Sequence, residues 1–365
     1  MEHRFYPLRV TGIVRETPDC VSLEFEVPAD LQAVFSYLPG QYLTLRRELE
    51  GEEVRRSYSL CSAPYEGRWR VAIKQVPGGR FSTYANRELP SIWQQQKGKL
   101  SLEVMPPKGD FVLKPEPSRA AQHVFFAAGS GITPVMAMLK EGLQREPHSS
   151  FVLFYGNRST EQIIFREELA ALKNRYPERF ALHYILSGEH PGSELFYGRI
   201  DREKCRVFFQ HLLNPREVEG FYLCGPLGMI EEVEAALQEF SVPSGKWHKE
   251  LFTPAGSGQK QSAATVEEEK GVEHAQIEVI IDDDLFRFEW DGSADNIVDA
   301  GIENNIDIPY SCKGGVCSTC KAKVLEGKVQ MRINYALEPD QVEAGYVLSC
   351  QCVPLTEKVV LSYDD

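Results

Sequence analysis

Three cysteines lie close together near the C-terminus, in the segment CKGGVCSTC that runs from Cys312 to Cys320. Thiolates spaced C-x4-C-x2-C among glycines and small polar residues suit a metal site, which usually needs a fourth ligand. Cys350, in VLSCQC, extends the spacing to C-x4-C-x2-C-x29-C. This pattern favours an iron–sulfur cluster over zinc, because zinc sites usually pair two C-x2-C knuckles. Cys352 is either an alternative ligand or, as we favour, a small core residue.

A cluster of this kind changes oxidation state by one electron, whereas a nicotinamide delivers two as hydride. A flavin accepts both and releases them singly, so a nicotinamide donor implies a flavin site elsewhere in the chain. RRSYSL provides a candidate site. Arg56 offers a forked cation to a phosphate, Tyr58 an aromatic face to the isoalloxazine, and Ser59 a hydroxyl to a ring nitrogen.

A second candidate flavin segment is GGRFST. Gly79 allows the backbone to approach a pyrophosphate, and a short helix that opens at Phe81, Ser82 and Thr83 provides N–H donors for anions. Taken alone, RRSYS is equally typical of a strand with two solvated arginines, and GGR of an ordinary turn. The order and spacing of the two segments, ahead of a nucleotide-binding region, favour the flavin interpretation.

A glycine-containing turn further along predicts the nucleotide site, and a second turn is a candidate for the same site. GSGITP follows the apolar strand VFFAA and opens a helix, as phosphate-cradling turns do. CGPLGM ends a later strand. The candidate residues in the first turn are Gly129, Gly131 and Thr133, and a family resemblance of the second turn adds Cys224, Gly225 and Pro226. The alternative for Cys224 is a buried cysteine at a strand end.

These motifs, in this order, resemble the ferredoxin–NADP reductase superfamily, followed by a plant-type [2Fe–2S] ferredoxin domain that IPYSCKGGVCSTCKAKVLEG and YVLSCQ resemble closely. The resemblance implies that Cys224 lies near the nicotinamide ring. It also implies that Glu250 and Phe252, in WHKELF, lie near the flavin edge. The catalytic candidates are therefore Ser59, Cys224 and Glu250, and the expected ligands of the cluster are Cys312, Cys317, Cys320 and Cys350.

Three differently patterned regions must position these residues. Residues 5–113 alternate apolar and polar positions in short runs, which predicts an antiparallel barrel or sandwich. Residues 122–252 alternate apolar strands with amphipathic helices, including one over 161–176, which predicts a doubly wound parallel sheet. We expect an FAD-binding β-barrel (1–115), an NAD(P)-binding α/β domain (116–252), a flexible linker (253–275) and an α+β ferredoxin domain of β-grasp fold (276–365).

The preference between NADH and NADPH depends on the residues that follow the strand FVLFYGN. An acidic residue there would bind the ribose 2′-OH, whereas an arginine accommodates a 2′-phosphate. Arg158 follows the strand and no acidic residue does, so we expect NADPH. Ser159 and Gln162 have capping-box spacing, so a helix start there would add N–H donors. Arg166 is a weaker candidate, and the alternative is that Arg158 is simply solvated.

Composition limits the possible partners. Residues 276–365 carry 17 acidic and 7 basic residues, and the rest of the chain carries 36 and 33, so the C-terminal domain holds most of the net charge of −13. Such a surface repels nucleic acid and suits either a basic protein partner or plain solubility. No apolar run is long enough to span a bilayer and the N-terminus has no signal-peptide core, so we expect a cytoplasmic protein without a membrane partner.

The expected function is NADPH-dependent transfer of electrons through FAD and the [2Fe–2S] cluster to a multi-subunit oxygenase. Within the superfamily, FYGNRSTEQIIFREELAALKNRYP and NYALEPDQVEAGYVLSCQ resemble the reductase components of phenylacetyl-CoA epoxidases, which have a di-iron centre. Related reductases with this domain order serve other oxygenases or reduce hybrid-cluster proteins. A redox sensor is the alternative from another class, although the chain has no segment that resembles an output or DNA-binding domain.

Overall fold

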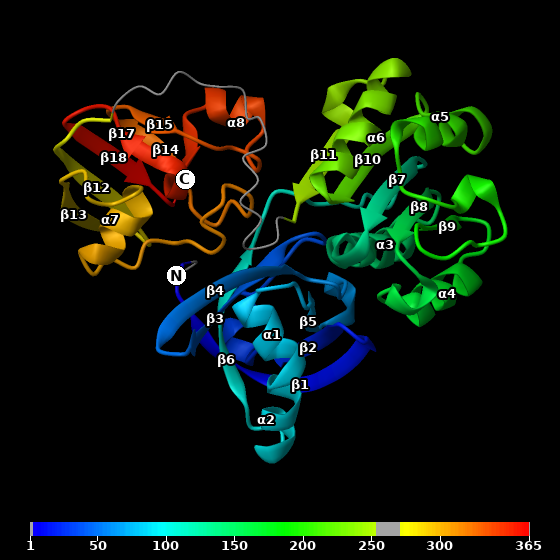
Figure 1. Cartoon of the computed structure of the whole chain (residues 1–365), viewed down its shortest axis with the longest axis horizontal. Coiled ribbons are helices and arrows are strands. Elements are labelled where there is room, and N and C mark those ends of the chain that lie inside the picture. The colour runs from blue at the N-terminus through cyan, green and yellow to red at the C-terminus, as the bar shows by residue number, and fades with distance from the viewer. Residues whose placement is uncertain (1–2, 253–270, 365) are drawn as a thin grey trace.

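The structure of the chain is a computed structural model that describes residues 3–252 and 271–364. Three units, each built on its own sheet and apolar core, follow one another along the chain. In Figure 1 the α/β unit (green) and the C-terminal unit (yellow to red) lie on either side above the N-terminal unit (blue). The predicted three-part architecture is confirmed. Residues 253–270 of the predicted linker lie outside the described residues.

The N-terminal unit is one antiparallel sheet in the order β4-β3-β6-β1-β2-β5. Strands β4 and β5 form the two edges of this sheet. An isolated bridge between Leu60, directly after β4, and Val71 of β5 joins the two edges and closes the sheet into a barrel. Alternating inward residues such as Leu8, Leu23 and Val104 fill the barrel. The elements are β1 (Tyr6–Thr17), β2 (Cys20–Glu26), β3 (Tyr42–Leu49), β4 (Glu52–Ser59), β5 (Trp69–Lys74), α1 (Arg80–Arg87), α2 (Leu89–Gln95) and β6 (Ser101–Lys108).

The middle unit is a five-stranded parallel sheet in the order β11-β10-β7-β8-β9. One apolar core covers the face with α3 and α4, and another covers the face with α5 and α6, so the sheet is doubly wound as predicted. The elements are β7 (Gln122–Ala128), α3 (Ile132–Arg145), β8 (Ser150–Asn157), α4 (Arg166–Arg175), β9 (Phe180–Leu186), α5 (Arg202–His211), β10 (Val218–Gly225), α6 (Leu227–Glu239) and β11 (Trp247–Leu251).

The helix predicted over 161–176 is shorter than expected. A three-residue turn of 3₁₀ helix covers Thr160–Gln162, and α4 begins only at Arg166. Ile163 and Ile164 are buried in the core, and Phe165 takes a left-handed conformation with φ 60°. Burying this apolar run breaks the helix, because a left-handed residue interrupts the i to i−4 hydrogen bonds.

The C-terminal unit has a mixed sheet in the order β13-β12-β18-β14-β16, where β12 and β18 are parallel. The predicted hairpin and short helix are present, with Asn296 capping the helix through the Asp299 N–H. The elements are β12 (Ala275–Ile281), β13 (Asp284–Trp290), α7 (Ile297–Glu303), β14 (Lys321–Glu326), β15 (Val329–Met331), α8 (Pro339–Glu343), β16 (Tyr346–Leu348), β17 (Cys352–Pro354) and β18 (Lys358–Ser362).

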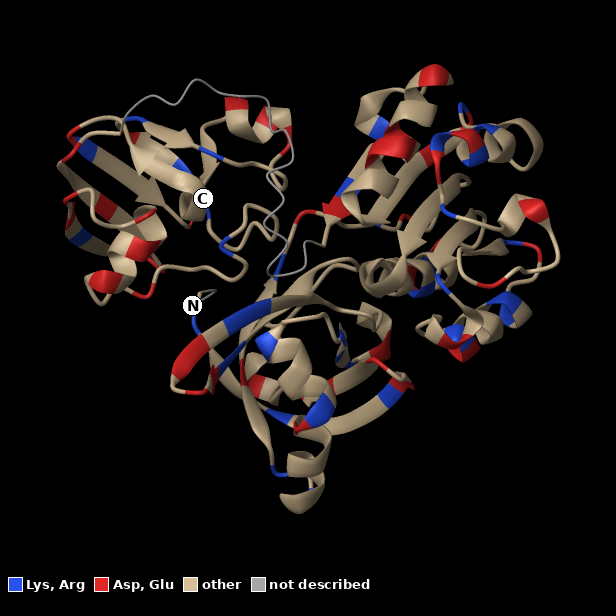
Figure 2. Ribbon diagram, in the orientation of Figure 1, with Lys and Arg blue, Asp and Glu red and all other residues tan. Residues whose placement is uncertain are grey.

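Acidic residues lie on both helices of this C-terminal unit, α7 and α8, as Figure 2 shows. Residues 271–275, at the end of the predicted linker, lead into the same unit, since the Val272 N–H donates to the Pro354 carbonyl (3.0 Å). None of the helices within residues 3–252 and 271–364 combines the length and apolar character needed to cross a membrane.

Candidate functional site

The predicted flavin residues Arg56, Tyr58 and Ser59 end strand β4. The Tyr58 ring lies 5.7 Å from the Phe81 ring of α1, and burial raises the pKa of the Tyr58 hydroxyl, which therefore stays neutral. Arg55 is paired with Glu53 and Asp307. Arg56, in contrast, donates only to the Arg55 carbonyl (2.6 Å) among the described residues. The charge of Arg56 is therefore available for an anion such as a pyrophosphate.

Helix α1 follows strand β5 and starts directly after Gly79. A Cβ on Gly79 would overlap Ser82 Oγ and Val76 Cγ2, so only glycine fits here. Ser82 Oγ accepts from the Val76 N–H (3.2 Å) and fixes the turn, while Phe81 is buried beneath it. No side chain caps α1, so its first N–H groups, up to that of Ser82, remain for a ligand. Thr83 is half-buried and its N–H donates to the Gly79 carbonyl.

The two predicted nucleotide turns meet at the ends of β7 and β10. A Cβ on Gly131 would overlap the Cys224 carbonyl, and one on Gly225 would lie 2.8 Å from Met229 Cε. The Gly129 carbonyl accepts from the Tyr155 hydroxyl (2.9 Å), and Thr133 Oγ1 donates to the Ser130 carbonyl (3.0 Å). Pro226 precedes the first turn of α6. The structure therefore brings all six predicted residues to one edge of the sheet, where ligands of open α/β sheets bind.

The three catalytic candidates converge from three elements. Cys224 of β10 is the register partner of Glu250 of β11, and Ser59 Oγ donates to Glu250 Oε2 (3.3 Å). Burial raises the pKa of Glu250 to about 8, although the hydrogen bond from Ser59 acts in the opposite direction. Burial, with a smaller effect of Glu250, also raises the pKa of Cys224, so its thiol stays protonated. Phe252 follows half-buried against the core of the α/β unit.

The raised pKa of Glu250 leads to a testable pH dependence of flavin reduction. Below about pH 8 the carboxyl is neutral, and above it a negative charge appears beside the predicted position of the flavin edge. We expect the rate of flavin reduction to fall about tenfold between pH 7 and pH 9. Glu250→Gln mimics the neutral acid and should keep the rate flat over this range, measured by stopped-flow absorbance. A Glu250→Gln profile that still falls near pH 8 would contradict the assignment.

The predicted 2′-phosphate residues lie at the edge of this site. Arg158 is exposed directly after β8. The capping prediction for Ser159 is wrong, because its side chain makes no capping bond and only a 3₁₀ turn follows. Glu189, from the loop after β9, accepts from the Thr160 N–H (2.7 Å) and hydroxyl (2.9 Å) instead. An acidic side chain thus reaches this turn from a distant segment, which inspection of the β8 end alone does not reveal.

The four predicted ligand cysteines come together in the C-terminal unit, within one loop and the turn after β16. Cys317 is the largest influence on the pKa of Cys312, and Cys350 on that of Cys320, which groups the four thiols into two pairs. The hydrogen bond from Cys317 and the N–H groups of the loop lower the pKa of Cys312 to about 5. Backbone N–H groups surround these two pairs of thiols. One pair of thiolates for each of two iron atoms is the ligand set of a [2Fe–2S] cluster, so the site fits such a cluster.

Cys352 has a different environment from these four residues. It is fully buried, burial raises the pKa of its thiol, and Sγ donates to the Leu348 carbonyl (3.2 Å). The thiol is therefore protonated and packed in the core, as expected for a structural cysteine.

The loop that carries Cys312, Cys317 and Cys320, called the cluster loop below, also contacts the barrel. The sequence patterns did not indicate this contact. The hydroxyls of Tyr42 and Thr319 lie 3.0 Å apart, and Ser57 Oγ lies 3.4 Å from Thr319 Oγ1. Close by, Asp307 accepts from Arg55 (2.5 Å). These partners are more than 250 residues apart in sequence, and no local pattern marks them.

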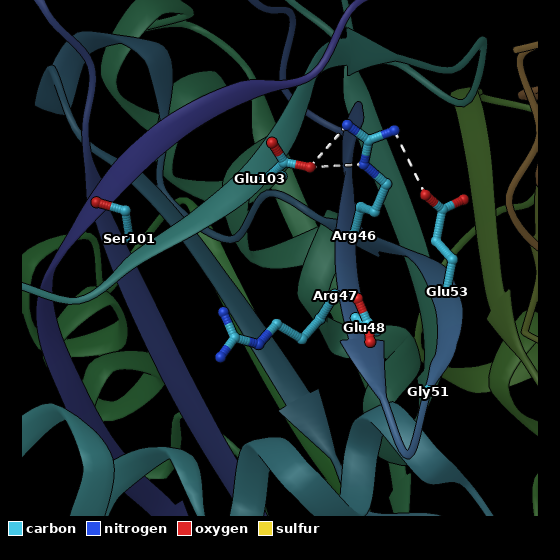
Figure 3. A pocket seen from close by; sticks show the side chains of 7 residues that line it. All are labelled: Arg46, Arg47, Glu48, Gly51, Glu53, Ser101 and Glu103. Carbon is cyan, nitrogen blue, oxygen red and sulfur yellow. Dashed lines mark hydrogen bonds and ion pairs between the residues drawn. The ribbon is translucent and has the colours of Figure 1, made fainter.

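Two pockets lie among the described residues, and residues on or directly after barrel strands line both. The smaller, of about 200 Å³, lies between the three units and is lined by Glu250, Phe111 and Ser318 among others. The larger, of about 440 Å³, lies by the β3–β4 hairpin and contains none of the predicted site residues. Figure 3 shows that Arg46 in the larger pocket is held between Glu103 and Glu53. Of these two pockets, the smaller is lined both by Glu250 and by residues of the cluster loop.

Three domain families match the chain in the order of its units. They are the oxidoreductase FAD-binding domain at residues 7–103, the oxidoreductase NAD-binding domain at 125–235 and the 2Fe-2S iron-sulfur cluster binding domain at 279–355. The units and their cofactor classes are therefore those of a flavin- and nicotinamide-dependent iron–sulfur oxidoreductase.

Curated relatives share this organisation through nearly their whole length. The chain is 41% identical to a subunit of the 1,2-phenylacetyl-CoA epoxidase of Escherichia coli (strain K12), over 99% of this chain and 98% of that protein. It is 34% identical to the ferredoxin reductase component of 3-ketosteroid-9-alpha-monooxygenase of Rhodococcus rhodochrous, over 98% of this chain and 96% of that protein. The solved structure of a phthalate dioxygenase reductase has the same fold, with a TM-score of 0.57 at 22% identity over 98% of each chain.

Proposed function

This chain belongs to the family of FAD- and NAD(P)H-dependent reductases that end in a [2Fe–2S] ferredoxin domain, and we propose that it serves a phenylacetyl-CoA epoxidase. It is an oxidoreductase and a reductase component of oxygenase systems. The near-full-length identity to a subunit of that epoxidase supports this acceptor. The cytoplasmic location and the multi-subunit nature of the acceptor stay predictions.

Reconstitution with purified oxygenase components tests the acceptor. The holoprotein should support NADPH-dependent turnover of phenylacetyl-CoA by the epoxidase oxygenase, and it should do so faster than with the 3-ketosteroid monooxygenase oxygenase. Faster coupling to the steroid enzyme, or to a hybrid-cluster protein, would contradict the proposal. Rapid NAD(P)H oxidation with ferricyanide as acceptor excludes a pure sensor.

The barrel residues would hold and orient the flavin. FAD, when bound, takes up two electrons from the nicotinamide as hydride and releases them one at a time. Arg56 and the uncapped N–H groups of α1 would bind its pyrophosphate, because both present positive charge beside the Gly79 turn. Tyr58 would pack against the ring, and Ser59, with Glu250, would offer hydrogen bonds at its edge.

The α/β domain would bring the nicotinamide to the same place. The turns at Gly129–Gly131 and Gly225–Pro226 lie at the sheet edge, where glycines allow a nucleotide phosphate to approach the backbone. Cys224, a neutral buried thiol beside Glu250, would pack by the nicotinamide ring, and Phe252 would cover the flavin edge. The C-terminal domain would hold the cluster through Cys312, Cys317, Cys320 and Cys350.

We further propose that the preferred nucleotide is NADPH. The support is that exposed Arg158 follows β8, with Arg166 at the start of the next helix. Glu189 already occupies the Thr160 N–H and hydroxyl, so recognition of a 2′-phosphate has to come from the arginine side chains. The hydrogen bonds that Glu189 accepts from the Thr160 N–H and hydroxyl lower the pKa of Glu189, which keeps it ionised, so the arginines must outweigh its charge.

Arg158→Ala should separate the two nucleotides. A charge-assisted contact contributes about 1.5–3 kcal/mol, so NADPH efficiency should fall about ten- to a hundredfold while NADH efficiency barely changes. The measurement is kcat/KM for both nucleotides with ferricyanide as acceptor. Arg175→Ala, at the other end of α4, is the control and should change neither. Equal losses for both nucleotides, or a wild type that already favours NADH, would show that Arg158 does not select the phosphate.

A further inference from the structure

A small group of hydroxyls links the barrel to the cluster loop. Thr319 is 2% exposed, and its Oγ1 lies 3.2 Å from Cys317 Sγ, to which it donates. The Tyr42 hydroxyl lies 3.0 Å from the same Oγ1. A threonine hydroxyl has one hydrogen, so a Thr319 that donates to the sulfur must accept from Tyr42. The chain of donors therefore runs from Tyr42 through Thr319 to Cys317.

The barrel holds Tyr42 rigidly in this position. Tyr42 is 3% exposed on β3, in register with Ser59 of β4. A Cβ on Gly109, which has φ 117°, would lie 2.9 Å from Tyr42 Cε1, so the backbone packs directly on the ring. Burial also raises the pKa of Tyr42, which keeps its proton available for donation.

The two ends of this chain of donors belong to different domains. Thr319 and Cys317 are in one loop of the C-terminal unit, whereas Tyr42 is on strand β3 of the barrel, so the Tyr42 bond exists only in the arrangement in which the two units touch. Hydrogen bonds to the sulfurs of an iron–sulfur site raise its reduction potential, since they stabilise the added negative charge. A donor that itself accepts a hydrogen bond in a buried site donates more strongly.

We infer that Tyr42 tunes the cluster in a docking-dependent way, through Thr319 and Cys317. While docked, the cluster is a better electron acceptor for the flavin. Once undocked it loses the Tyr42 bond and becomes a better donor to the next protein. Because the two effects are thermodynamically linked, reduction of the cluster strengthens binding of the C-terminal domain to the barrel by the same factor by which this binding favours reduction. The inference rests on the proposed flavin and cluster sites, in particular on ligation by Cys317, and does not depend on which nucleotide or which acceptor protein is used.

The test is the cluster midpoint potential of the full-length holoprotein, from a redox titration followed by the paramagnetic signal of the reduced cluster. Tyr42→Phe keeps the buried ring but removes the hydroxyl. The equilibrium constant for reducing the cluster should fall about three- to tenfold, the effect expected of one hydrogen bond. For a one-electron couple a tenfold change is about 59 mV.

Tyr310→Phe is the matched control, because the Tyr310 hydroxyl also crosses this interface, to Glu53 Oε1 (3.5 Å), but no cysteine accepts from it among the described residues. Its potential should equal that of the wild type. Thr319→Ser keeps the hydroxyl and should also match the wild type. In a Thr319→Val background, Tyr42→Phe should have no further effect, since the link is already broken.

A Tyr42→Phe potential equal to that of Tyr310→Phe would overturn the inference, and so would a Tyr42→Phe shift that persists with Thr319→Val. If Thr319→Val fails to load a cluster, the comparison of Tyr42→Phe with Tyr310→Phe still decides. The titration uses a chemical reductant, so a wrong acceptor or nucleotide assignment leaves its result unchanged. A wild type without an iron–sulfur signal would overturn the proposed ligation and this inference together.

Discussion

Cys350→Ala should yield a protein that binds FAD but has lost the ferredoxin-type absorbance and the paramagnetic signal of its reduced cluster. Cys350 provides the sulfur that pairs with Cys320, and it comes from the turn after β16 rather than from the cysteine loop. With one thiolate missing, the site can no longer complete the four-cysteine set of such a cluster. FAD should remain, because the barrel has an apolar core of its own.

Cys352→Ala is the control for this experiment. Cys352 is only two residues away and equally buried, but its thiol donates to the Leu348 carbonyl and packs in the core of the C-terminal unit. We expect normal iron and sulfide content and a somewhat lower melting temperature, as for other truncations of buried side chains. Loss of the cluster in Cys352→Ala, with retention in Cys350→Ala, would reverse the assignment. Zinc in place of iron in the wild type would refute the cluster itself.

The features that the sequence predicted well are those whose chemistry requires a local pattern. Cysteines at C-x4-C-x2-C spacing must lie on one loop, and Gly131 must be small because the Cys224 carbonyl lies against it. Strand periodicity likewise predicted the barrel and the parallel sheet. A barrel strand buries one face and alternates apolar with polar residues, whereas a parallel strand buried on both faces is apolar throughout. In these places the local pattern and the tertiary structure require the same residues.

The features that the sequence did not predict depend on contacts between distant segments. Tyr42 lies within QYLTLRREL and has the pattern of an ordinary strand residue, yet its hydroxyl meets Thr319 in another domain. Glu189 reaches the turn after β8 from a loop about thirty residues later. The Ser159 prediction failed because burial of Ile163 and Ile164 outweighed the helical preference of the residues around them. Such outcomes are set by packing, which spacing along the chain does not encode.

Gly131→Ala should nearly abolish reduction of the flavin by either nicotinamide. Gly131 lies between β7 and α3, and its added methyl would overlap the carbonyl of Cys224 on β10. Backbone on both sides is fixed by the parallel pairing of β7 and β10, so the turn has to move outward. That displacement shifts the N–H groups at the start of α3 and widens the gap beside Cys224. A misplacement of about 1 Å costs about a hundredfold in rate, and we expect at least that loss.

Gly228→Ala provides the matched control, because a Cβ there meets no atom within 4 Å and the residue lies at the start of α6 in the same sheet edge. Both variants should contain full FAD and an intact cluster, and dithionite should reduce both normally, since the barrel and the cysteine loop are untouched. The measurement is single-turnover flavin reduction by NADPH and by NADH. A Gly131→Ala variant as fast as Gly228→Ala would show that the nucleotide does not depend on this turn. Loss of FAD in Gly131→Ala would mean instead that the methyl disturbs the whole protein, so that the turn has a structural role.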